Sequence, residues 1–371
     1  MKAVSAAVLV ALSSISAGAF AQSNLTFYGR LDGGLQYVRP SNIDGVGQDS
    51  TFGLVSGHTN GSRFGMKGSE NLGGGLKAIF VLEAGYGLDD GVSTQGGRLF
   101  GREAFVGLDG KAGTLAMGRF GGLTSGAGTF NMMKFDPFST AWDLAGMKAF
   151  SFVNKRLDNA VVYVAPTMGG VTASVMHSFA TNGQEVAGTE NNERYSGVGA
   201  NYKLGKLLMG LHYEQISLVE SSGLPDQKSV QFGAYYDFPA VRAYFNYEKS
   251  IDAAVKGVSK SSADADSYMV GLKAALPGGA GDLLASYQMR DGKAFNIGAK
   301  QYEADLQIFS LGYLYPLSKR TQIYASYVIS VGDKSWDKDA GLAGNSLSAA
   351  SASQRADYNS QVATFGLRTR F

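Results

Sequence analysis

The sequence predicts an all-β protein: a sixteen-stranded antiparallel transmembrane β-barrel with a long third loop folded into the lumen. Three observations lead to this fold class. Segments of about ten residues alternate between apolar and polar side chains, as transmembrane strands do. Short turns and long polar loops follow one another in strict alternation. After the N-terminal segment, no apolar run approaches the roughly 18 residues that a membrane-spanning helix needs.

The N-terminal segment has the layout of a secretory signal peptide. Lys2 provides a positive start, residues 6–15 form an apolar core, and Ala19-Phe20-Ala21 is a small-x-small cleavage site. We therefore expect residues 1–21 to be removed and residues 22–371 to form one barrel domain. The chain has no cysteine, so an exported protein of this sequence cannot rely on disulfides. Its 33 Lys and Arg against 31 Asp and Glu exclude a strongly basic, nucleic-acid-binding balance.

Alternation with a period of two is clearest in the C-terminal half of the chain. In the last predicted strand one face carries Ala363, Phe365, Leu367, Thr369 and Phe371, and the other carries Thr364, Gly366, Arg368 and Arg370. Residues 230–238, 241–248, 268–276 and 283–290 repeat the pattern. Soluble β-sandwiches also alternate, so the connections between strands must discriminate between the two architectures.

The connections favour the membrane barrel. Short turns are expected near 71–75, 109–113, 166–170, 205, 239–240, 277–281 and 316–321. Longer polar loops are expected at 39–60, 89–97, 121–158, 180–193, 219–227, 252–265, 292–303 and 332–358. These fifteen connections join sixteen strands, with short turns on one rim, long loops on the other, and both termini on the short-turn, periplasmic side. All seven prolines fall in the connections, as expected for residues that cannot donate to a sheet.

A barrel of sixteen strands leaves an aqueous channel, whereas eight strands fill their interior with side chains. The loop 121–158 is the longest, and it is too apolar for a freely solvated loop. Its large apolar residues are Phe130, Met132, Met133, Phe135, Phe138, Trp142, Leu144, Met147, Phe150 and Phe152. Because these groups need a surface to pack on, we expect the loop to fold into the lumen and set the constriction.

Several segments resemble the general diffusion porins of Gram-negative bacteria, and most closely their β-proteobacterial branch. They are Tyr28-Gly29-Arg30-Leu31-Asp32, the run from Ser62 to Leu76 (SRFGMKGSENLGGGL), Arg102 to Leu108, Met117-Gly118-Arg119, Arg156-Leu157-Asp158-Asn159 and Gly366 to Phe371. The resemblance covers essentially the whole mature chain. It implies a homotrimer of sixteen-stranded barrels in the outer membrane, a constriction made by the third loop, and no cofactor.

Four arginines are candidates for a basic wall opposite the loop. Alternation points Arg30 and Arg63 into the lumen, because their neighbours Leu31 and Phe64 are suited to lipid. By alternation, Arg102 would lie on the same face as Val106 and Leu108, which are suited to lipid. The resemblance nevertheless implies an inward arginine at this position. The resemblance also implies an inward basic residue at Arg156.

Asp136 and Asp143, on the long loop, are the candidate acids that oppose this wall. Such a pair of walls would place a transverse field across the constriction. The alternative is that each charge simply solvates a wet lumen face. If Arg102 points inward, Glu103 should point outward, either near a rim or covered by a neighbouring subunit, because a bare carboxylate in lipid is unfavourable.

Other motifs do not indicate catalysis. Gly73-Gly74-Gly75 lacks the Lys-Ser/Thr of a phosphate-binding loop, and the three histidines lack metal-ligand spacing. An outer-membrane lipase or protease would need an ordered nucleophile and base, which the sequence does not provide. The sequence therefore predicts a passive channel for small hydrophilic solutes and ions that is mildly anion-selective and is not an enzyme. The alternative is a solute-specific outer-membrane channel.

The expected partners follow from the same interpretation. They are two further copies of the chain, outer-membrane lipids and lipopolysaccharide, and the transported solutes and ions, with no nucleic acid. The outward aromatic–aliphatic face that ends at Phe371 resembles the terminal signal read by the barrel assembly machinery.

Overall fold

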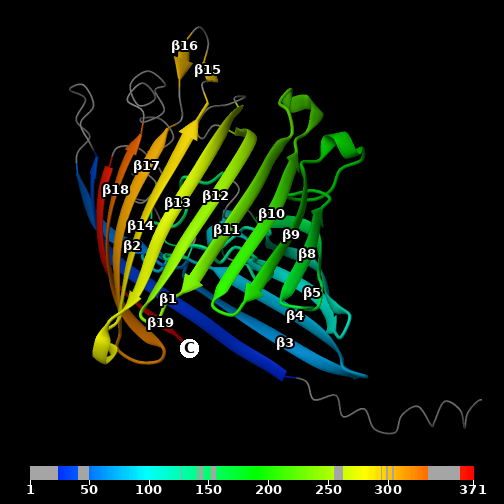
Figure 1. Ribbon diagram of the computed structural model, residues 1–371. Coiled ribbons are helices and arrows are strands. Elements are labelled where there is room, and N and C mark those ends of the chain that lie inside the picture. The colour runs from blue at the N-terminus through cyan, green and yellow to red at the C-terminus, as the bar shows by residue number, and fades with distance from the viewer. Residues whose placement is uncertain are drawn as a thin grey trace, which may run out of the picture.

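The structure is a computed structural model that describes residues 24–40, 50–126, 128–139, 142, 145–151, 156–254, 262–293, 295–297, 300–302, 305–332 and 360–371. The predicted signal peptide, residues 1–21, lies outside the described residues. One antiparallel sheet of 17 strands closes on itself as a barrel (Figure 1). The sequence prediction of an all-β barrel is confirmed.

The strands follow the chain in order around the barrel. They are β1 (Asn24–Pro40), β2 (Thr51–Ser56), β3 (Arg63–Gly73), β4 (Leu76–Gly85), β5 (Glu103–Gly110), β6 (Gly113–Gly121), β7 (Arg156–Val164), β8 (Val171–Ser178), β9 (Arg194–Leu204), β10 (Leu207–Ser217), β11 (Gln227–Asp237), β12 (Val241–Ala254), β13 (Ser262–Ala275), β14 (Asp282–Gly292), β17 (Leu306–Pro316), β18 (Thr321–Gly332) and β19 (Ser360–Arg370). Strands β15 (Phe295–Ile297) and β16 (Lys300–Tyr302) form a separate hairpin.

The second barrel strand is interrupted. Both β2 and β3 pair with β1, β2 along residues 33–38 and β3 along residues 24–30. They are therefore two parts of one barrel strand, and the barrel has sixteen strands, as the connections predicted. The sequence prediction placed residues 39–60 in a loop, but residues 51–56 within that range pair with β1.

The barrel closes where the last strand meets the first. β19 pairs with β1 from Arg30↔Arg370 to Pro40↔Ser360. Beyond β19, the amide of Phe371 donates to the carbonyl of Gly29 at 3.2 Å, and the amide of Gly29 donates to the carbonyl of Phe371 at 3.2 Å. Closure pairs the sheet edges that would otherwise be open to aggregation or to lipid.

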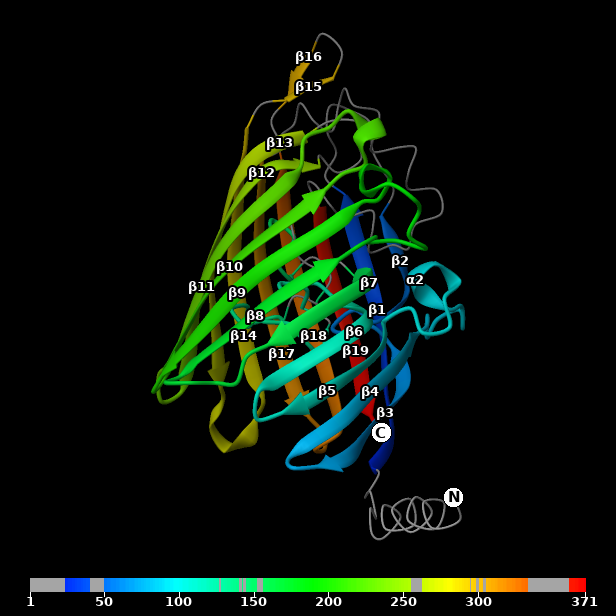
Figure 2. The same ribbon diagram turned by 90° about the vertical axis from the view of Figure 1, so that its right-hand side faces the viewer.

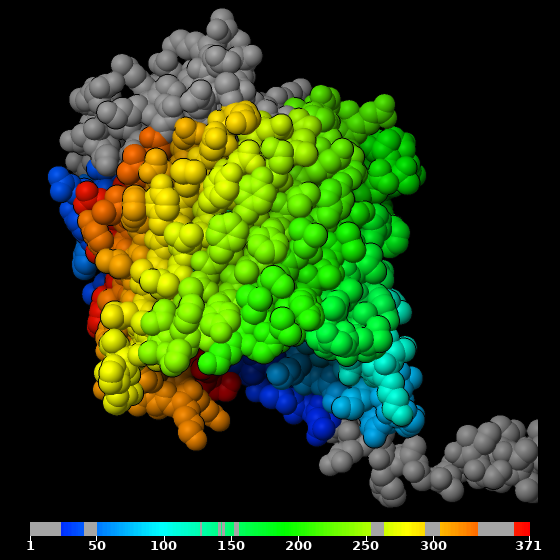
Figure 3. Space-filling model, in the orientation of Figure 1, coloured from blue at the N-terminus to red at the C-terminus, as the bar shows by residue number. Residues whose placement is uncertain are grey.

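The two faces of the sheet differ in the way that alternation predicted. Large apolar side chains such as Phe27 and Val106 are exposed on the outside, at 66% and 54%. Side chains on the inner face, such as Gln36 and Ser267, are buried. Figure 3 shows the outside of β10 to β14, coloured green to yellow, as a continuous surface.

The rims differ as well. Short turns join the strands on one rim, while the long connections on the other carry α2 (Thr94–Gly97), the 3₁₀ turns Thr189–Asn191 and Glu220–Ser222, and the β15–β16 hairpin (Figure 2). A third 3₁₀ turn, Pro277–Gly279, lies in a short turn. No helix in the described part of the chain is both long and apolar enough to cross a bilayer.

Candidate functional site

The connection between β6 and β7 runs along the inner wall of the barrel. In Figures 1 and 2 its teal segments lie inside the ring of strands. The described apolar side chains of this loop are all buried: Phe130, Met132, Met133, Phe135, Phe138, Trp142, Met147 and Phe150. They join three successive apolar clusters, formed with β4–β10, with β10–β13, and with β14, β17–β19 and β1. Leu144 and Phe152 lie outside the described residues.

Missing side chains on the wall make room for the loop. A Cβ built on Gly210 would lie 2.7 Å from ring carbon Cε2 of Phe135, and one built on Gly271 would lie 2.7 Å from Cγ of Pro137. Since real Cβ atoms essentially never approach so closely, the glycines permit a loop position that alanine would obstruct.

Polar side chains of the wall hold the loop's backbone. The amide of Leu123 donates to the hydroxyl of Tyr195 at 3.1 Å, and the amide of Ser151 donates to Glu248 at 2.7 Å. Between these points, Asn201 donates to the carbonyl of Met132 at 2.9 Å. The loop is thus anchored near both of its ends and along its length, by groups that would otherwise be buried without a partner.

Trp142 of the loop contacts the segment 57–62, which interrupts the barrel strand between β2 and β3. His58, in this interruption, stacks on Tyr324 with ring centroids 5.7 Å apart, and its imidazole lies edge-to-face with Trp142 at 6.0 Å. Its Nε2 lies 2.9 Å from the hydroxyl of Ser326. The interruption therefore supplies an inward contact for the loop.

A charged cluster occupies the wall near the loop's starting point. Glu83, on β4, forms ion pairs with Arg102 at 2.6 Å and with Arg63 at 3.4 Å. The hydroxyl of Tyr28 donates to the other oxygen of Glu83 at 3.0 Å. One carboxylate thus serves two guanidinium groups, and the Nη2 atoms of both arginines have no hydrogen-bond partner among the described residues.

Arg156 belongs to the same cluster. It is the first residue of β7, and it interacts electrostatically with Arg102 and Arg63. Its buried Nε has no hydrogen-bond partner in the described part of the structure. The structure therefore brings Arg63, Arg102 and Arg156 together.

Arg30 lies at the edge of this cluster. It interacts electrostatically with Arg102, but more strongly with Arg368 and Arg370 of the last strand. Arg30 therefore connects the cluster to the end of β19.

Arg102 and Glu103 both lie inside at the start of β5, although we expected them to point in opposite directions. Arg102 precedes the first residue of the strand, so strand alternation does not govern it. Glu103 was expected to point outward, but it is 5% exposed and accepts hydrogen bonds from the amide and hydroxyl of Thr129, both at 2.7 Å. It therefore anchors the long loop, and the expectation that it points outward, near a rim or against a neighbouring subunit, is wrong.

Glu83 was missed by the sequence prediction. The signal was present: Val81 and Glu83 alternate with Phe80 and Leu82, so a pattern of lipid-facing residues leaves Glu83 on the inner face.

Asp136, the described loop acid, has no arginine among its partners in the described structure. Asp136 is 9% exposed, and one of its oxygens accepts a hydrogen bond from the amide of Phe138 at 2.8 Å. It interacts electrostatically with Tyr244 of β12, beneath the loop. Asp143 lies outside the described residues.

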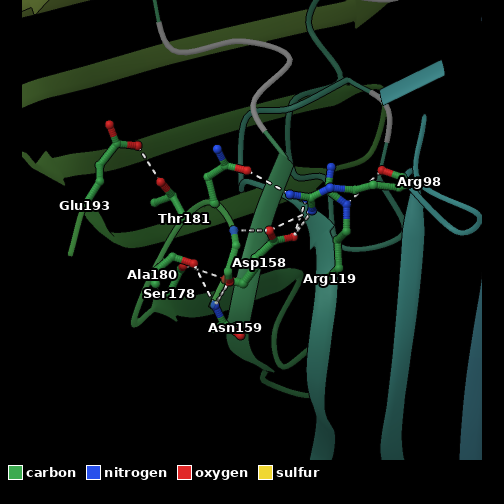
Figure 4. Close-up of polar contacts among 11 residues, drawn as sticks. Arg98, Arg119, Asp158, Asn159, Ser178, Ala180, Thr181 and Glu193 are labelled. Carbon is green, nitrogen blue, oxygen red and sulfur yellow. Dashed lines mark hydrogen bonds and ion pairs between the residues drawn. The ribbon is translucent and has the colours of Figure 1, made fainter. Parts of the chain in front are cut away.

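A second network fixes the end of the loop, at the start of β7 (Figure 4). Asp158 accepts hydrogen bonds from Arg98 at 2.6 Å, from Arg119, and from the amide of Gly183 at 2.7 Å. The next residue, Asn159, has a φ of 46°, at a register shift between β6 and β7. The bulge lets Asp158 join three segments near the position that carries Arg156.

Comparisons with known proteins agree with this architecture. A family model described as Gram-negative porin matches residues 4–333. An outer membrane porin protein of Bordetella pertussis is 34% identical over 360 residues, which cover 85% of this chain and 90% of that protein. Outer membrane porin protein 32 of Delftia acidovorans is 30% identical over 328 residues, with coverage of 86% and 87%.

A solved structure has the same fold. An anion-selective porin from Comamonas acidovorans has a TM-score of 0.72 and 26% identity, with coverage of 94% of this chain and 100% of that one. The closed sixteen-stranded barrel, the family match and the two relatives lead to one conclusion: the chain belongs to the Gram-negative porin family, whose members are passive channels in the outer membrane.

Proposed function

We propose that this porin is mildly anion-selective and that Arg63, Arg102 and Arg156 form the basic wall of its constriction, extended by Arg30. The main support for this proposal is that the cluster contains more arginines than carboxylates. Glu83 is the carboxylate that pairs with Arg63 and Arg102 at 3.4 and 2.6 Å. Glu103 is bound to the loop through Thr129. Among the described ion pairs, Glu83 is thus the carboxylate that serves this group of arginines.

Excess positive charge in a narrow aqueous pore attracts anions and repels cations. The effect is strongest where the walls are close, because the low-dielectric protein focuses the field on the water between them. Since arginine stays protonated at any physiological pH, the wall keeps its sign. The similar structure from Comamonas acidovorans is described as anion-selective, which supports the same preference here. The loop acids Asp136 and Asp143 would set how mild the preference is.

The test is the zero-current potential across a planar bilayer that separates two KCl concentrations. We expect the wild type to favour chloride, and Arg63→Gln and Arg156→Gln each to move the potential toward cation selectivity. Lys111→Gln, in an exposed short turn, is the matched control and should leave the potential unchanged. A cation-selective wild type would overturn the proposal, as would unchanged selectivity in both arginine variants.

We also propose that three copies assemble in the outer membrane, among lipids that include lipopolysaccharide. The family membership supports the trimer, and the apolar outer face supports contact with lipid. Chemical cross-linking of native membranes should give a ladder that ends at the trimer. A ladder that ends at the monomer would contradict this.

Function of this kind needs no catalytic centre and no cofactor, and we propose that the protein is not an enzyme. Among the described residues, no group of three or more His, Asp or Glu side chains is placed to hold a metal ion. Turnover of ester or peptide substrates by the purified barrel would contradict this proposal.

A further inference from the structure

Three arginines lie side by side across three neighbouring strands. Arg30 of β1 is directly opposite Arg370 of β19 on one side and directly opposite Arg63 of β3 on the other. Directly opposed residues of an antiparallel pair have Cβ atoms about 5 Å apart and point to the same face. The three guanidinium groups therefore form a row on the inner wall of the barrel.

Only one end of this row has a carboxylate partner in the described structure. Arg63 is paired with Glu83. The described residues provide no ion pair for Arg30 or for Arg370. Like charges directly opposite one another in a sheet repel, so this arrangement is unfavourable unless something else compensates the charge.

The nearest acid is already engaged. Asp32 is directly opposite Arg368, two residues along the strands from the Arg30–Arg370 pair. Its carboxylate is fully buried and accepts hydrogen bonds from the hydroxyl of Tyr324 at 2.7 Å and from the amide of Asn60 at 3.0 Å. Arg368 also has partners, because it donates to Gln322 at 2.6 Å. Arg30 and Arg370 are therefore two neighbouring cations without an ion-pair partner in the described structure, and Arg30 has only the partial electrostatic compensation of Asp32.

The pair lies on the short-turn side of the barrel and is accessible to water. Arg30 is half-buried and Arg370 is exposed. The amide of Arg370 donates to the carbonyl of Arg320, in the short turn between β17 and β18, at 3.1 Å. The pair is therefore close to the periplasmic rim, whereas Arg102 and Arg156 lie where the loop leaves and rejoins the wall.

We propose that Arg30 and Arg370 form a binding site for small polyvalent oxyanions at the periplasmic side of the constriction. Guanidinium groups bind oxyanions through paired, charge-assisted N–H···O contacts. Two of them side by side can serve one doubly charged anion of the sulfate, phosphate or dicarboxylate class. Arg63, the next residue in the row, leads from this site to the constriction.

The site rests on the proposed function only in that anions must reach it through the lumen. It does not require net anion selectivity, because a local site can bind an anion in a pore of either preference. It also makes a different prediction: binding saturates, whereas selectivity from a diffuse field does not.

The experiment measures block of the chloride current by potassium sulfate in a planar bilayer with constant KCl. We expect sulfate to reduce the current with a saturable dependence in the wild type. Arg30→Gln and Arg370→Gln should each raise the half-blocking concentration about thirtyfold, the effect of one charge about 4 Å from a doubly charged anion in water. Arg320→Gln, on the same rim but outside the row, is the matched control and should retain the wild-type value.

Conservative variants separate a binding site from simple charge. Arg30→Lys keeps the charge but loses the planar pair of donors, so we expect a smaller rise in the half-blocking concentration than in Arg30→Gln. This variant also serves if Arg30→Gln does not fold. Absence of saturable block in the wild type, unchanged block in both glutamine variants, or an equal shift in Arg320→Gln would each overturn the site.

The zero-current potential in KCl is measured on the same membranes. A cation-selective wild type that still shows saturable sulfate block, weakened in Arg30→Gln, would overturn the proposed selectivity and support the site. Anion selectivity without saturable block would do the reverse.

Discussion

The ring of Phe135 occupies the space in front of Gly233, so closely that a Cβ on this glycine would overlap the ring carbons Cδ2 and Cγ. Phe135 is fully buried, and Gly210, directly opposite Gly233 on β10, lies against the ring carbons Cε2 and Cζ. The loop is therefore positioned partly by two missing side chains on neighbouring strands. Its place in the lumen depends on wall residues that are far from it in the sequence.

Adding one methyl group to the wall should move the loop. In Gly233→Ala, the new Cβ overlaps Phe135, and overpacking of this kind costs about 1–3 kcal/mol. We expect the loop to shift away from β11, with a changed single-channel conductance and a lower free energy of unfolding in urea. Gly53→Ala is the control, because a Cβ at this position has nothing within 4 Å. Equal conductance and stability of the two variants would show that the loop is not held by this contact.

Neutralising Glu83 should strengthen anion selectivity. Glu83→Gln removes the negative charge that Arg63 and Arg102 share, so the wall becomes more positive. We expect the chloride-to-potassium permeability ratio to rise roughly twofold, since pore water and salt screen a single charge. Glu70→Gln, at an exposed position near a short turn, is the matched control. A ratio that falls in Glu83→Gln would show that the carboxylate acts by holding the arginines in place.

Asp136 should make the loop's position depend on pH. This residue is on the loop and not on a membrane-spanning strand, and burial raises its pKa from the model-peptide value of 3.8 to about 7. While the loop is packed against the barrel wall, the Asp136 carboxyl keeps its proton up to about pH 7. When the loop leaves the wall, Asp136 has its ordinary pKa and loses the proton above about pH 4. The packed position of the loop therefore loses stability as the pH rises from about 4 to 7, and above pH 7 its stability stays at the lower value.

Channel noise in planar bilayers at pH 5 and pH 8 measures this effect. We expect fewer fluctuations of the channel current at pH 5, where Asp136 is protonated, than at pH 8. Asp136→Asn keeps the size of the side chain but does not titrate, so its noise should be the same at both pH values. If the asparagine variant retains the full pH dependence, another group is responsible.

The sequence was sufficient for the barrel because lipid and water impose a period of two on every strand. Alternation and the turn–loop pattern predicted sixteen strands, and the structure has them. The prediction failed where the backbone departs from regular strand geometry. Residues 51–56 were assigned to a loop because the interruption at 57–62 hides the continuation of the strand.

The charged cluster was only partly predictable for the same reason. Arg63 is the first residue of β3, and the alternation of that strand gave its direction. Glu103 is the first residue of β5 and shares the inner face with Phe105, whereas Arg102 precedes the strand and turns inward independently of its alternation. The environment of Asp136 depends on its contacts with Phe138 and Tyr244, and Tyr244 lies on a strand that is distant in the sequence. Such pairings are properties of the folded barrel and are not visible in a local pattern.

Phe371 should matter more for assembly than for the stability of the finished barrel. Its ring lies over Gly29, where a Cβ would be 2.6 Å from Cε1, but the side chain is still 58% exposed. In Phe371→Ala the two backbone hydrogen bonds with Gly29 remain, so the free energy of unfolding should fall by no more than about 1 kcal/mol. If the terminal ring is a signal for the assembly machinery, as the sequence resemblance implies, the amount of folded protein in the outer membrane should fall severalfold.

Phe365 provides the matched control for this prediction. It points outward from the same strand and is also 58% exposed. Phe365→Ala should therefore change the stability of the purified barrel about as much as Phe371→Ala, while leaving assembly in cells close to normal. Both variants are measured as heat-resistant barrel in outer-membrane fractions and by urea unfolding after refolding in detergent. Equal loss of assembly in the two variants would mean that cells sense the apolar outer face as a whole, and that position 371 carries no separate signal.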